Sequence, residues 1–342
     1  MNIIAIDVHI TTLEFAVINK QGRHTKSQTI ETSEKGMIEF IKTIPKQRKI
    51  YIEEGNLSSW IVETCSRFNE TVVVTDPKIN RWIGHDEEKY DKIDAIKLGR
   101  LAYGNYVKEI HHSVGERQRF REIILFYHDL VKSQTRIKNK IKSKFRQYAV
   151  NCTGTTVYKD ECQNAWINKL PKHIVIRFML QRLFKQLKQI ENCIDQTVKL
   201  LKKYCNLYSE IKLFQELPGI GKIHSATISS LLTNPYRFSS KTKVWKYAGL
   251  GIVGKGSGGK QYSQNLTINY NRILKYTMKQ AALSAIQSKP NYFSKKYKDL
   301  LMKNIHPNRA LLTIARSMLV TMWAMWKKGE HFNPKIKNKI KI

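Results

Sequence analysis

Asn2-Ile-Ile-Ala-Ile-Asp7 opens the stretch of sequence that decides the fold. Two further extended segments follow it, Leu13–Ile18 and His24–Glu31, with a turn at Asn19-Lys-Gln-Gly22 between them. Short runs rich in apolar and β-branched residues, bounded by turn residues, are typical of strands. The chain therefore begins with three consecutive predicted strands.

Helix and strand signals alternate after these three strands. We expect a helix, a strand, a helix and a strand over Ser33–Thr43, Lys49–Glu53, Leu57–Phe68 and Thr71–Val74. Three strands followed by this alternation give the order of a ribonuclease H-like α/β domain, and a doubly wound sheet is the competing architecture. We assign residues 1–105 to this domain.

The middle of the chain, residues 106–208, has the apolar spacing of long helices. A first series runs from Ile123 to Tyr148, broken by Lys144, and a more regular one follows at Ile176, Leu180, Leu183, Leu187, Ile190, Ile194, Thr197 and Leu201. Sustained spacing of this kind predicts a coiled coil, formed either within one chain or between chains. We expect this region to serve in assembly.

Residues 209–342 predict a third, mostly helical domain. Leu217-Pro-Gly-Ile-Gly-Lys222 stands between two helical segments, as in a helix-hairpin-helix. There Gly219, Gly221 and Lys222 would let backbone N–H groups and a cation approach a phosphate at a helix N-terminus. A plain tight turn is the alternative.

A second glycine-rich stretch, Gly249–Lys260, contains Ser257 between Lys255 and Lys260. Its composition favours a flexible loop that binds phosphate through its backbone and its two lysines. A nucleophilic serine is the other interpretation, although no general base stands beside it in the sequence.

The charge of the chain indicates the class of its partner. Lysine and arginine number 60 against 27 acidic residues, a formal net charge of +33. So large an excess favours nucleic acid. We expect phosphate contacts along one basic segment, at Lys132, Arg136, Lys138, Lys140, Lys142, Lys144 and Arg146.

Other classes of protein are disfavoured. No apolar run reaches the roughly 20 residues that span a bilayer, and the N-terminus has no secretory signal. The five cysteines are odd in number and form no Cys-x-x-Cys pair, which argues against zinc and against a disulfide framework. We expect a cytoplasmic protein of a bacterial or archaeal nucleoid, without a membrane partner.

The few acids mark the chemistry. Asp7 ends the first predicted strand, Glu53 and Glu54 end the fourth, and Asp91 and Asp94 lie one helical turn apart. An unpaired carboxylate after four apolar residues is costly to bury, whereas carboxylate oxygens suit Mg²⁺ or Mn²⁺ acting on a phosphodiester. Successive strand residues face opposite sides of a sheet, so only one of Glu53 and Glu54 can point toward the metal site, and we favour Glu53.

These motifs together resemble the DEDD-type transposases of one insertion-sequence family, in the family's order along nearly the whole chain. They are Asp7, the Glu-Glu-Gly after a strand, Lys89-Tyr-Asp-Lys-Ile-Asp-Ala95, Leu217-Pro-Gly-Ile-Gly221 and Tyr247-Ala-Gly-Leu…Gly-Ser-Gly. The first domain of such enzymes is similar to Holliday-junction resolvases of the RuvC type, and a separate C-terminal transposase domain follows.

The resemblance implies that Asp7, Glu53, Asp91 and Asp94 hold Mg²⁺ and that Ser257 becomes covalently joined to DNA. It implies a recombinase that cleaves and exchanges donor and target DNA, guided by a bridge RNA that the element encodes. A homodimer or homotetramer, with a composite site between subunits, is expected.

Two departures from the family pattern leave other functions open. The serine loop has Gly-Ser-Gly rather than Ser-Ser-Gly, and a Glu-Glu doublet replaces a single Glu followed by a small residue. The alternatives are a RuvC-like endonuclease that cleaves by water, and a non-catalytic nucleic-acid-binding relative.

Overall fold

The computed structural model describes residues 1–80, 91–257 and 260–334, and for 79–80, 91–92, 255–257 and 260–264 it describes the backbone alone. The chain divides into two compact units, Met1–Arg119 and Phe120–Ile342. The predicted division into domains 1–105, 106–208 and 209–342 stays a prediction. No helix among the described residues is both long enough and apolar enough to cross a membrane.

The N-terminal unit is built on a six-stranded sheet with the strand order β3-β2-β1-β4-β5-β6. Its strands are β1 (Asn2–Val8), β2 (Thr12–Ile18), β3 (His24–Glu31), β4 (Arg48–Glu53), β5 (Val72–Thr75) and β6 (Glu109–Ile110). The first three form an antiparallel meander, and β4 and β5 join β1 in parallel. This order confirms the ribonuclease H-like prediction, because a doubly wound sheet would not begin with an antiparallel meander.

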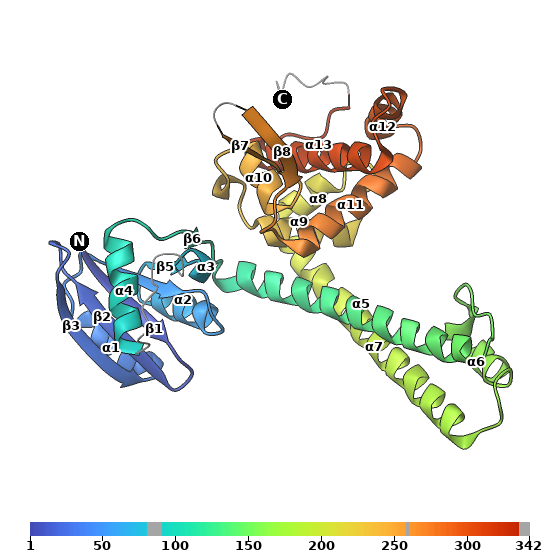
Figure 1. The fold of residues 1–342 in the computed structure, drawn as a ribbon, viewed down its shortest axis with the longest axis horizontal. Helices are drawn as coiled ribbons and strands as arrows, with labels where there is room; N and C mark the ends of the chain where they lie inside the picture. Colours follow the sequence, from blue (N-terminus) through green and yellow to red (C-terminus); the bar gives the residue numbers. More distant parts are fainter. Residues whose placement is uncertain (81–90, 258–259, 335–342) are drawn as a thin grey trace. The chain divides into compact units, whose positions relative to one another are not determined.

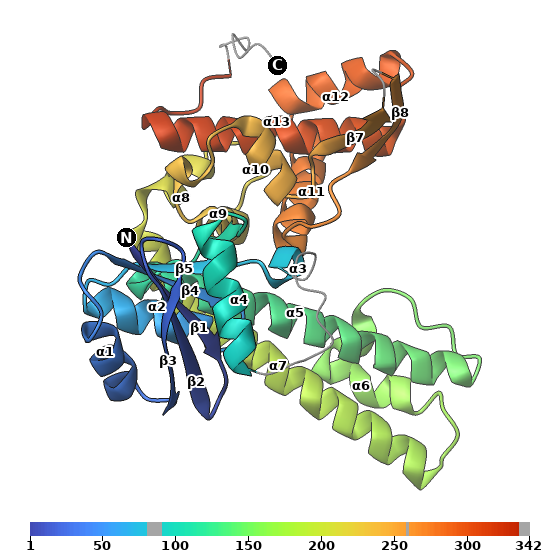
Figure 2. The ribbon, with the colours of Figure 1, turned by 60° about the vertical axis from the view of Figure 1, so that its left-hand side comes forward.

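Helices cover both faces of the sheet, as Figures 1 and 2 show, and the strand alternation decides which residues face which helix. Ile4 and Ile6 share a core with Met37 of α1 (Glu34–Lys42) and Ile61 of α2 (Ser58–Arg67). Between those two strand positions, Ala5 faces the opposite side. That side is covered by α4 (Asp91–Tyr103), and a short helix, α3 (Pro77–Asn80), precedes it.

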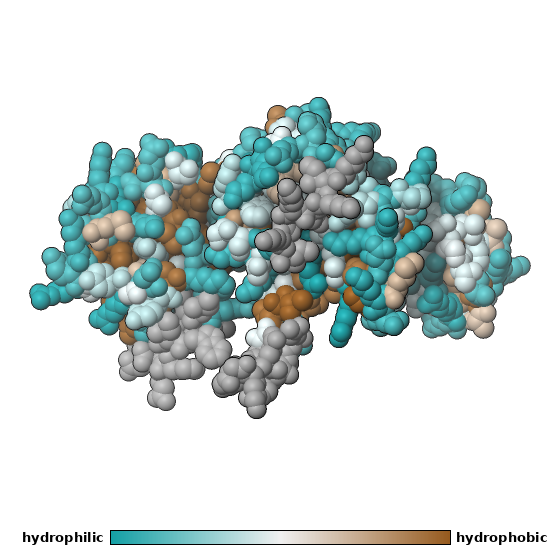
Figure 3. All heavy atoms as spheres, turned by 90° about the horizontal axis from the view of Figure 1, so that it is seen from above, coloured by the Kyte–Doolittle hydropathy of each residue, from teal (hydrophilic) through white to brown (hydrophobic). Residues whose placement is uncertain are grey.

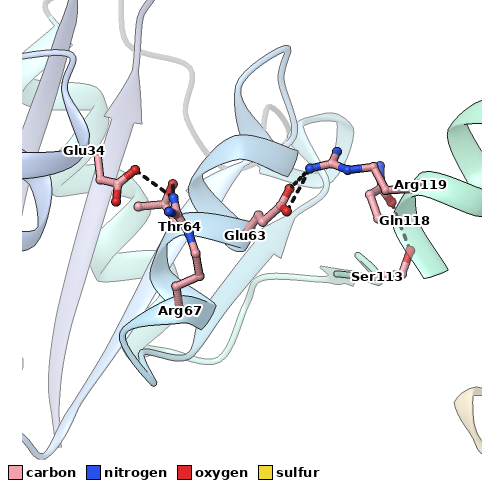
Figure 4. A network of polar contacts seen from close by, with 7 residues as sticks. All are labelled: Glu34, Glu63, Thr64, Arg67, Ser113, Gln118 and Arg119. Atoms are coloured by element: carbon pink, nitrogen blue, oxygen red, sulfur yellow. Dashed lines mark hydrogen bonds and ion pairs between the residues drawn. The ribbon is translucent and has the colours of Figure 1, made fainter. Parts of the chain in front are cut away.

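A polar network fixes α2 against its neighbours (Figure 4). Arg67 donates a 2.7 Å hydrogen bond to Glu34 of α1, and the guanidinium of Arg119 contacts both carboxylate oxygens of Glu63 at 2.8 Å. Arg119 lies in the first turns of α5 (Gly115–Gln147). These charged hydrogen bonds link α2 to α1 and to Arg119 at the end of the N-terminal unit, on partly exposed side chains.

Two long helices of the second unit, α5 and α7 (Ile174–Leu207), pair antiparallel within the chain. Phe120 and Ile124 near the start of α5 pack with Leu201 near the end of α7. Phe145 near the end of α5 packs with Leu180 near the start of α7. The coiled-coil prediction is thus confirmed as an intrachain pair, joined through η1 (Thr156–Tyr158) and α6 (Asp160–Ile167).

The predicted first heptad series was wrong at its end. Tyr148 is exposed, since α5 stops at Gln147 and Ala149 takes a positive φ of 56° that turns the chain away. Phe145 is buried instead.

The rest of the second unit is mostly helical, as predicted, around one apolar core. Its elements are α8 (Ser209–Phe214), α9 (Lys222–Leu232), η2 (Pro235–Arg237), α10 (Lys241–Tyr247), β7 (Ile252–Ser257), β8 (Lys260–Leu266), α11 (Arg272–Gln287), α12 (Tyr292–Met302) and α13 (Pro307–Lys328). The long helix α13 buries Ile314, Met318 and Met322 in this core.

Gly219 explains why the turn before α9 needs glycine. Its φ is +81°, and a Cβ there would lie 2.4 Å from the backbone nitrogen of Ala285 in α11. The turn therefore packs directly on α11, which no residue with a side chain would permit.

Candidate active site

Asp7 and Glu53 lie on the same face of the sheet, at the ends of two neighbouring parallel strands. Ile6 of β1 stands beside Ile52 of β4 in the register, so the next residues lie side by side, with Glu53 at the end of β4 and Asp7 one residue before the end of β1. Both follow residues that point into the core beneath α1 and α2, and both therefore point to the opposite, α4-covered face.

The helix α4 runs antiparallel to β1, which directs its N-terminal turns toward this carboxylate edge. Tyr103, its last residue, packs on Gly22 beside the start of β1, where a Cβ would lie 2.7 Å from the ring. Further along, Gly99 lies against Ala5, with 3.4 Å between a Cβ at Gly99 and the Cβ of Ala5.

These contacts bring Asp94 level with Asp7 along the strand direction. Asp94 lies five residues before Gly99, about 7.5 Å along the helix, and Asp7 lies two residues beyond Ala5, about 6.6 Å along the strand. Leu98, four residues after Asp94, is buried against the sheet, so Asp94 lies on the side of the helix next to the residues that face the sheet. Asp91 begins the helix, one turn before Asp94.

The contacts of the carboxylates differ. Asp7 Oδ2 lies 3.1 Å from Nε2 of His9, and its side chain is 26% exposed. Asp94 is 49% exposed, with Lys97 Nζ at 4.0 Å from its Oδ1. Within the ranges that the structure describes, no three His, Cys, Asp or Glu side chains form a ready metal cluster.

Glu53 and Glu54 have different surroundings. Glu54 extends beyond β4 and its Oε2 lies 2.5 Å from Nε2 of His112, a largely buried imidazole. Glu53 keeps its place through its backbone: its carbonyl accepts a 3.2 Å bond from Ser58 Oγ, which in turn accepts from the Gly55 amide at 2.8 Å. The strand position favours Glu53 as the residue of this edge.

Sequence reasoning missed a further acid. Glu14 of β2 stands directly opposite Asp7 in the antiparallel pair and thus on the same face. It is 7% exposed and accepts a 2.6 Å hydrogen bond from Thr29 of β3. The signal was an acid inside an apolar strand, Leu13-Glu-Phe15, two of whose neighbours point to the other face.

The sequence of the chain agrees with known families. Residues 4–150 match the family model of the IS110 DEDD transposases. Residues 211–298 match a second model, that of the transposase IS116/IS110/IS902 family. The chain belongs to the IS110 family of DEDD transposases. A transposase is an enzyme that cuts and recombines DNA, and DEDD nuclease folds generally use divalent metal ions.

Two relatives and one solved structure are similar to this transposase. The transposase for insertion sequence element IS1111A of Coxiella burnetii is 19% identical over 71% of this chain and 68% of the relative. The insertion element IS116 uncharacterized 44.8 kDa protein of Streptomyces clavuligerus is 22% identical over 44% of this chain and 38% of the relative. Thermus thermophilus RuvC in complex with a Holliday junction substrate is 13% identical, covering 32% of this chain and 100% of its own, with a TM-score of 0.25 that supports no conclusion.

Ser257 lies in a hairpin of the transposase, where the sequence predicted a flexible loop. β7 and β8 pair antiparallel, from Ile252 beside Leu266 to Ser257 beside Lys260. The prediction was wrong because Ile252, Val253 and Tyr262 favour strand pairing, which the glycines between them tolerate. The side chains of Lys255, Ser257 and Lys260 lie outside the described part of the chain.

The segment predicted as a helix-hairpin-helix or a plain tight turn lies between α8 and α9 and lines an open groove. Gly219, Gly221, Lys222 and His224 line it, and Gly221 is the N-cap of α9, whose first backbone N–H groups have no partner within the helix. Behind the groove, Nε2 of His128 lies 3.0 Å from the Thr227 hydroxyl. Burial, together with the nearby His224, lowers the pKa of His128 to about 4.

The basic segment of α5 divides between two faces. Lys132, Arg136 and Lys140 are exposed at successive helical turns and line one shallow hollow with Thr135, Asn139 and Ser143. Lys138 instead pairs with Glu191 of α7 at 3.2 Å, and both Lys138 and Lys142 lie over the Tyr158 ring. Lys138, one of the residues expected to contact phosphate, therefore already has an acidic partner within the chain.

Proposed function

We propose that this transposase cleaves and exchanges DNA strands of its own mobile element, with a divalent metal at the carboxylate edge and Ser257 as the nucleophile. One observation supports the proposal: Asp7 and Glu53 lie side by side on one face, near the carboxyl ends of adjacent parallel strands, and the contacts of α4 put Asp94 at about the same level. Asp91, one turn before Asp94, completes the proposed set of four.

The donor set fits Mg²⁺ or Mn²⁺. It consists of carboxylate oxygens alone, the hard ligands that these ions prefer. An ion bound there would supply Lewis acidity that neutralises charge on the phosphate and lowers the pKa of a coordinated oxygen. The residues themselves place negative charge at fixed strand and helix positions. The contact of 3.1 Å between Asp7 Oδ2 and His9 Nε2 restrains the Asp7 side chain.

The serine step is a transesterification. The Oγ of Ser257 attacks a phosphodiester phosphorus, an Oγ–P bond forms, and one P–O bond of the DNA backbone breaks. The serine proton goes to solvent and the leaving oxygen takes up a proton. The energy of the phosphodiester is kept in the serine ester, so a second DNA hydroxyl can reverse the attack and reseal a new pair of strands.

The partners follow from charge and family. A net charge of +33, the exposed row Lys132, Arg136 and Lys140, and the groove at Gly219–Lys222 all favour polyanions. We propose donor and target DNA as substrates, with a bridge RNA of the element as guide and a homodimer or homotetramer as the active assembly. Hydrophilic residues cover most of the face seen in Figure 3, in keeping with such partners.

A denaturing gel of labelled DNA tests the proposal. Wild-type protein, co-expressed RNA and Mg²⁺ should give a protease-sensitive shifted band that Ser257→Ala abolishes. Ser263→Ala, which changes the other serine of the same hairpin, is the matched control and should keep the band. Asp7→Asn should abolish both band and cleavage.

Other outcomes of this gel identify the competing functions. Cleaved DNA without an adduct in any sample would replace the serine mechanism by hydrolysis. Cleavage that survives Asp7→Asn would refute the metal site. Full activity after RNase treatment would contradict the proposal that a guide RNA is needed.

A further inference from the structure

A cavity of about 300 Å³ lies in the C-terminal part of the chain, where α10, the base of β7, α12 and α13 meet. The residues of α13 that line it, from Thr313 to Thr321, lie in the middle part of that helix, and Figures 1 and 2 show α10 and α12 alongside it. The volume is at the small end of the range for ligand sites, about 300–1,000 Å³. It admits one small planar group and excludes a duplex.

The walls of the cavity offer an aromatic face and apolar side chains. Trp245 of α10, Ile252 of β7 and Val320 of α13 line it. The indole N–H of Trp245 donates a 3.1 Å hydrogen bond to the Arg316 carbonyl, which holds the ring in a fixed orientation. A fixed indole beside an open cavity is suited to stacking against a planar base.

Lys296 and Arg316 are two half-buried cations of the same lining, which also holds Lys241, with its Nζ 6.0 Å from the centroid of the Trp245 ring. Lys296 Nζ donates a 3.2 Å hydrogen bond to Ser317 Oγ, and Arg316 Nε donates a 2.6 Å bond to the Leu250 carbonyl. No carboxylate within the described ranges forms an ion pair with either residue. Burial lowers the pKa of both side chains, as expected for cations withdrawn from water.

Such cations are costly to keep without a partner of opposite charge. A purely structural role would favour apolar side chains here, since the surrounding core is apolar. The cavity therefore presents an aromatic wall for an apolar planar group and two positive charges for an anion. A nucleotide carries both.

We propose that this cavity binds one unpaired nucleotide of the DNA substrate, with the base against Trp245 and its phosphate at Lys296 and Arg316. The assignment to DNA rests on the proposed function, because β7 begins at this cavity and ends at Ser257. Ser257 lies five residue steps beyond Ile252 along the strand, about 17 Å, which equals about five nucleotides of a stacked strand at about 3.4 Å each. The cavity would hold an extruded base close to the point of strand exchange.

Fluorescence anisotropy with the full chain tests this without any chemistry. The protein carries Ser257→Ala and the buffer contains EDTA, so the result does not depend on the metal site or on the serine. The probes are two labelled DNA duplexes, one with a single unpaired adenine nucleotide and one with an abasic residue in its place. We expect the adenine probe to bind about 10-fold more tightly.

Two variants of different kinds carry the test. Lys296→Gln removes one charge and keeps a hydrogen-bonding group for Ser317, and Thr313→Phe fills the cavity without changing charge. Both should abolish the preference for adenine over the abasic probe. Lys295→Gln, which changes an exposed neighbour of Lys296 on the same helix, should keep it.

Equal binding of the two probes by the Ser257→Ala protein would overturn the proposal, as would an unchanged preference in both Lys296→Gln and Thr313→Phe. The same pair of probes made of RNA distinguishes the source of the nucleotide. A preference seen with RNA alone would overturn the assignment to DNA. If the gel shows no protein–DNA adduct but the adenine probe still binds more tightly than the abasic probe, the serine mechanism is refuted and the proposal for the cavity stands.

Discussion

The sheet edge of the N-terminal unit gathers carboxylates, whereas the cavity of the C-terminal region gathers cations. Asp7, Glu14 and Glu53 stand on neighbouring strands of one face. Lys296 and Arg316 come from two helices that meet over an apolar core. Like charges held close together are unfavourable in an isolated protein and become favourable when a ligand of opposite sign binds. The carboxylate edge is therefore suited to a bound metal cation, and the cavity is suited to an anionic phosphate.

The largest effect on DNA cleavage should come from replacing Glu53, with its neighbour Glu54 replaced for comparison. Glu53→Gln should lower Mg²⁺-dependent DNA cleavage at least about 10²-fold, the scale of one lost electrostatic group in an active site. Glu54→Gln should change it less than about 3-fold, since Glu54 is bonded to His112 outside the strand. Single-turnover cleavage rates at saturating Mg²⁺ measure both variants.

A reversal of the two effects would move the metal ligand to Glu54 and would contradict the argument from strand faces. Equal and small effects would mean that the carboxylate edge is not the site of cleavage.

The next largest effect should be on DNA binding by the basic face of α5, which lies outside both the carboxylate edge and the cavity. Replacing Lys132, Arg136 and Lys140 together by Gln should weaken DNA binding and lower the slope of log K against log salt by about 0.9 for each phosphate that no longer meets a cation. Lys138→Gln and Lys142→Gln together form the control, because these two lysines lie over Tyr158 within the chain. If the control pair changes the slope as much as the triple variant, the division of α5 into two faces is wrong.

The carboxylate edge was open to prediction because strand patterns fix both the position and the side of a residue. Asp7 and Glu53 each follow a continuous apolar run near the carboxyl end of a predicted strand, and the parallel register of β1 and β4 then places both on one face. Glu14 escaped notice, since a single acid within an apolar strand gives a weak signal until its partner strand is known.

The cationic cavity was beyond prediction for the opposite reason. Lys241, Trp245, Lys296 and Arg316 come from segments as much as 75 positions apart in the sequence, and each alone is typical of an ordinary surface or core position. Only the packing of α10, α12 and α13 brings them together. The hairpin at Ser257 was missed because glycine content was given more weight than the β-forming residues on either side.

A smaller effect should appear as pH dependence in the cation-rich unit. His128 has a pKa lowered to about 4 by burial and by His224, so the folded state keeps it neutral while the unfolded state binds a proton near pH 6.5. Stability should therefore fall as pH drops from about 6.5 toward 4. Allowing for the partial exposure of His128, wild type should lose about 1 kcal/mol more than His128→Gln between about pH 7 and pH 5.

Urea unfolding of both proteins at the two pH values measures this difference, and the comparison cancels groups common to both. Gln retains a hydrogen-bonding group for Thr227. Identical pH dependence in the two proteins would show that His128 titrates normally, and that this part of the unit accepts a further positive charge.

The smallest effect should be a gain in stability. Lys296→Gln removes a half-buried cation beside Arg316, so the DNA-free protein should melt about 1–3 °C higher, and added salt should reduce the difference by screening. Lys295→Gln, in an exposed position, should leave the melting temperature unchanged. A saturating adenine-containing probe should reverse the order, because wild type gains more from a bound phosphate than the variant does. A lower melting temperature for Lys296→Gln without DNA would mean that Lys296 stabilises the fold, and its charge would then need no ligand to explain it.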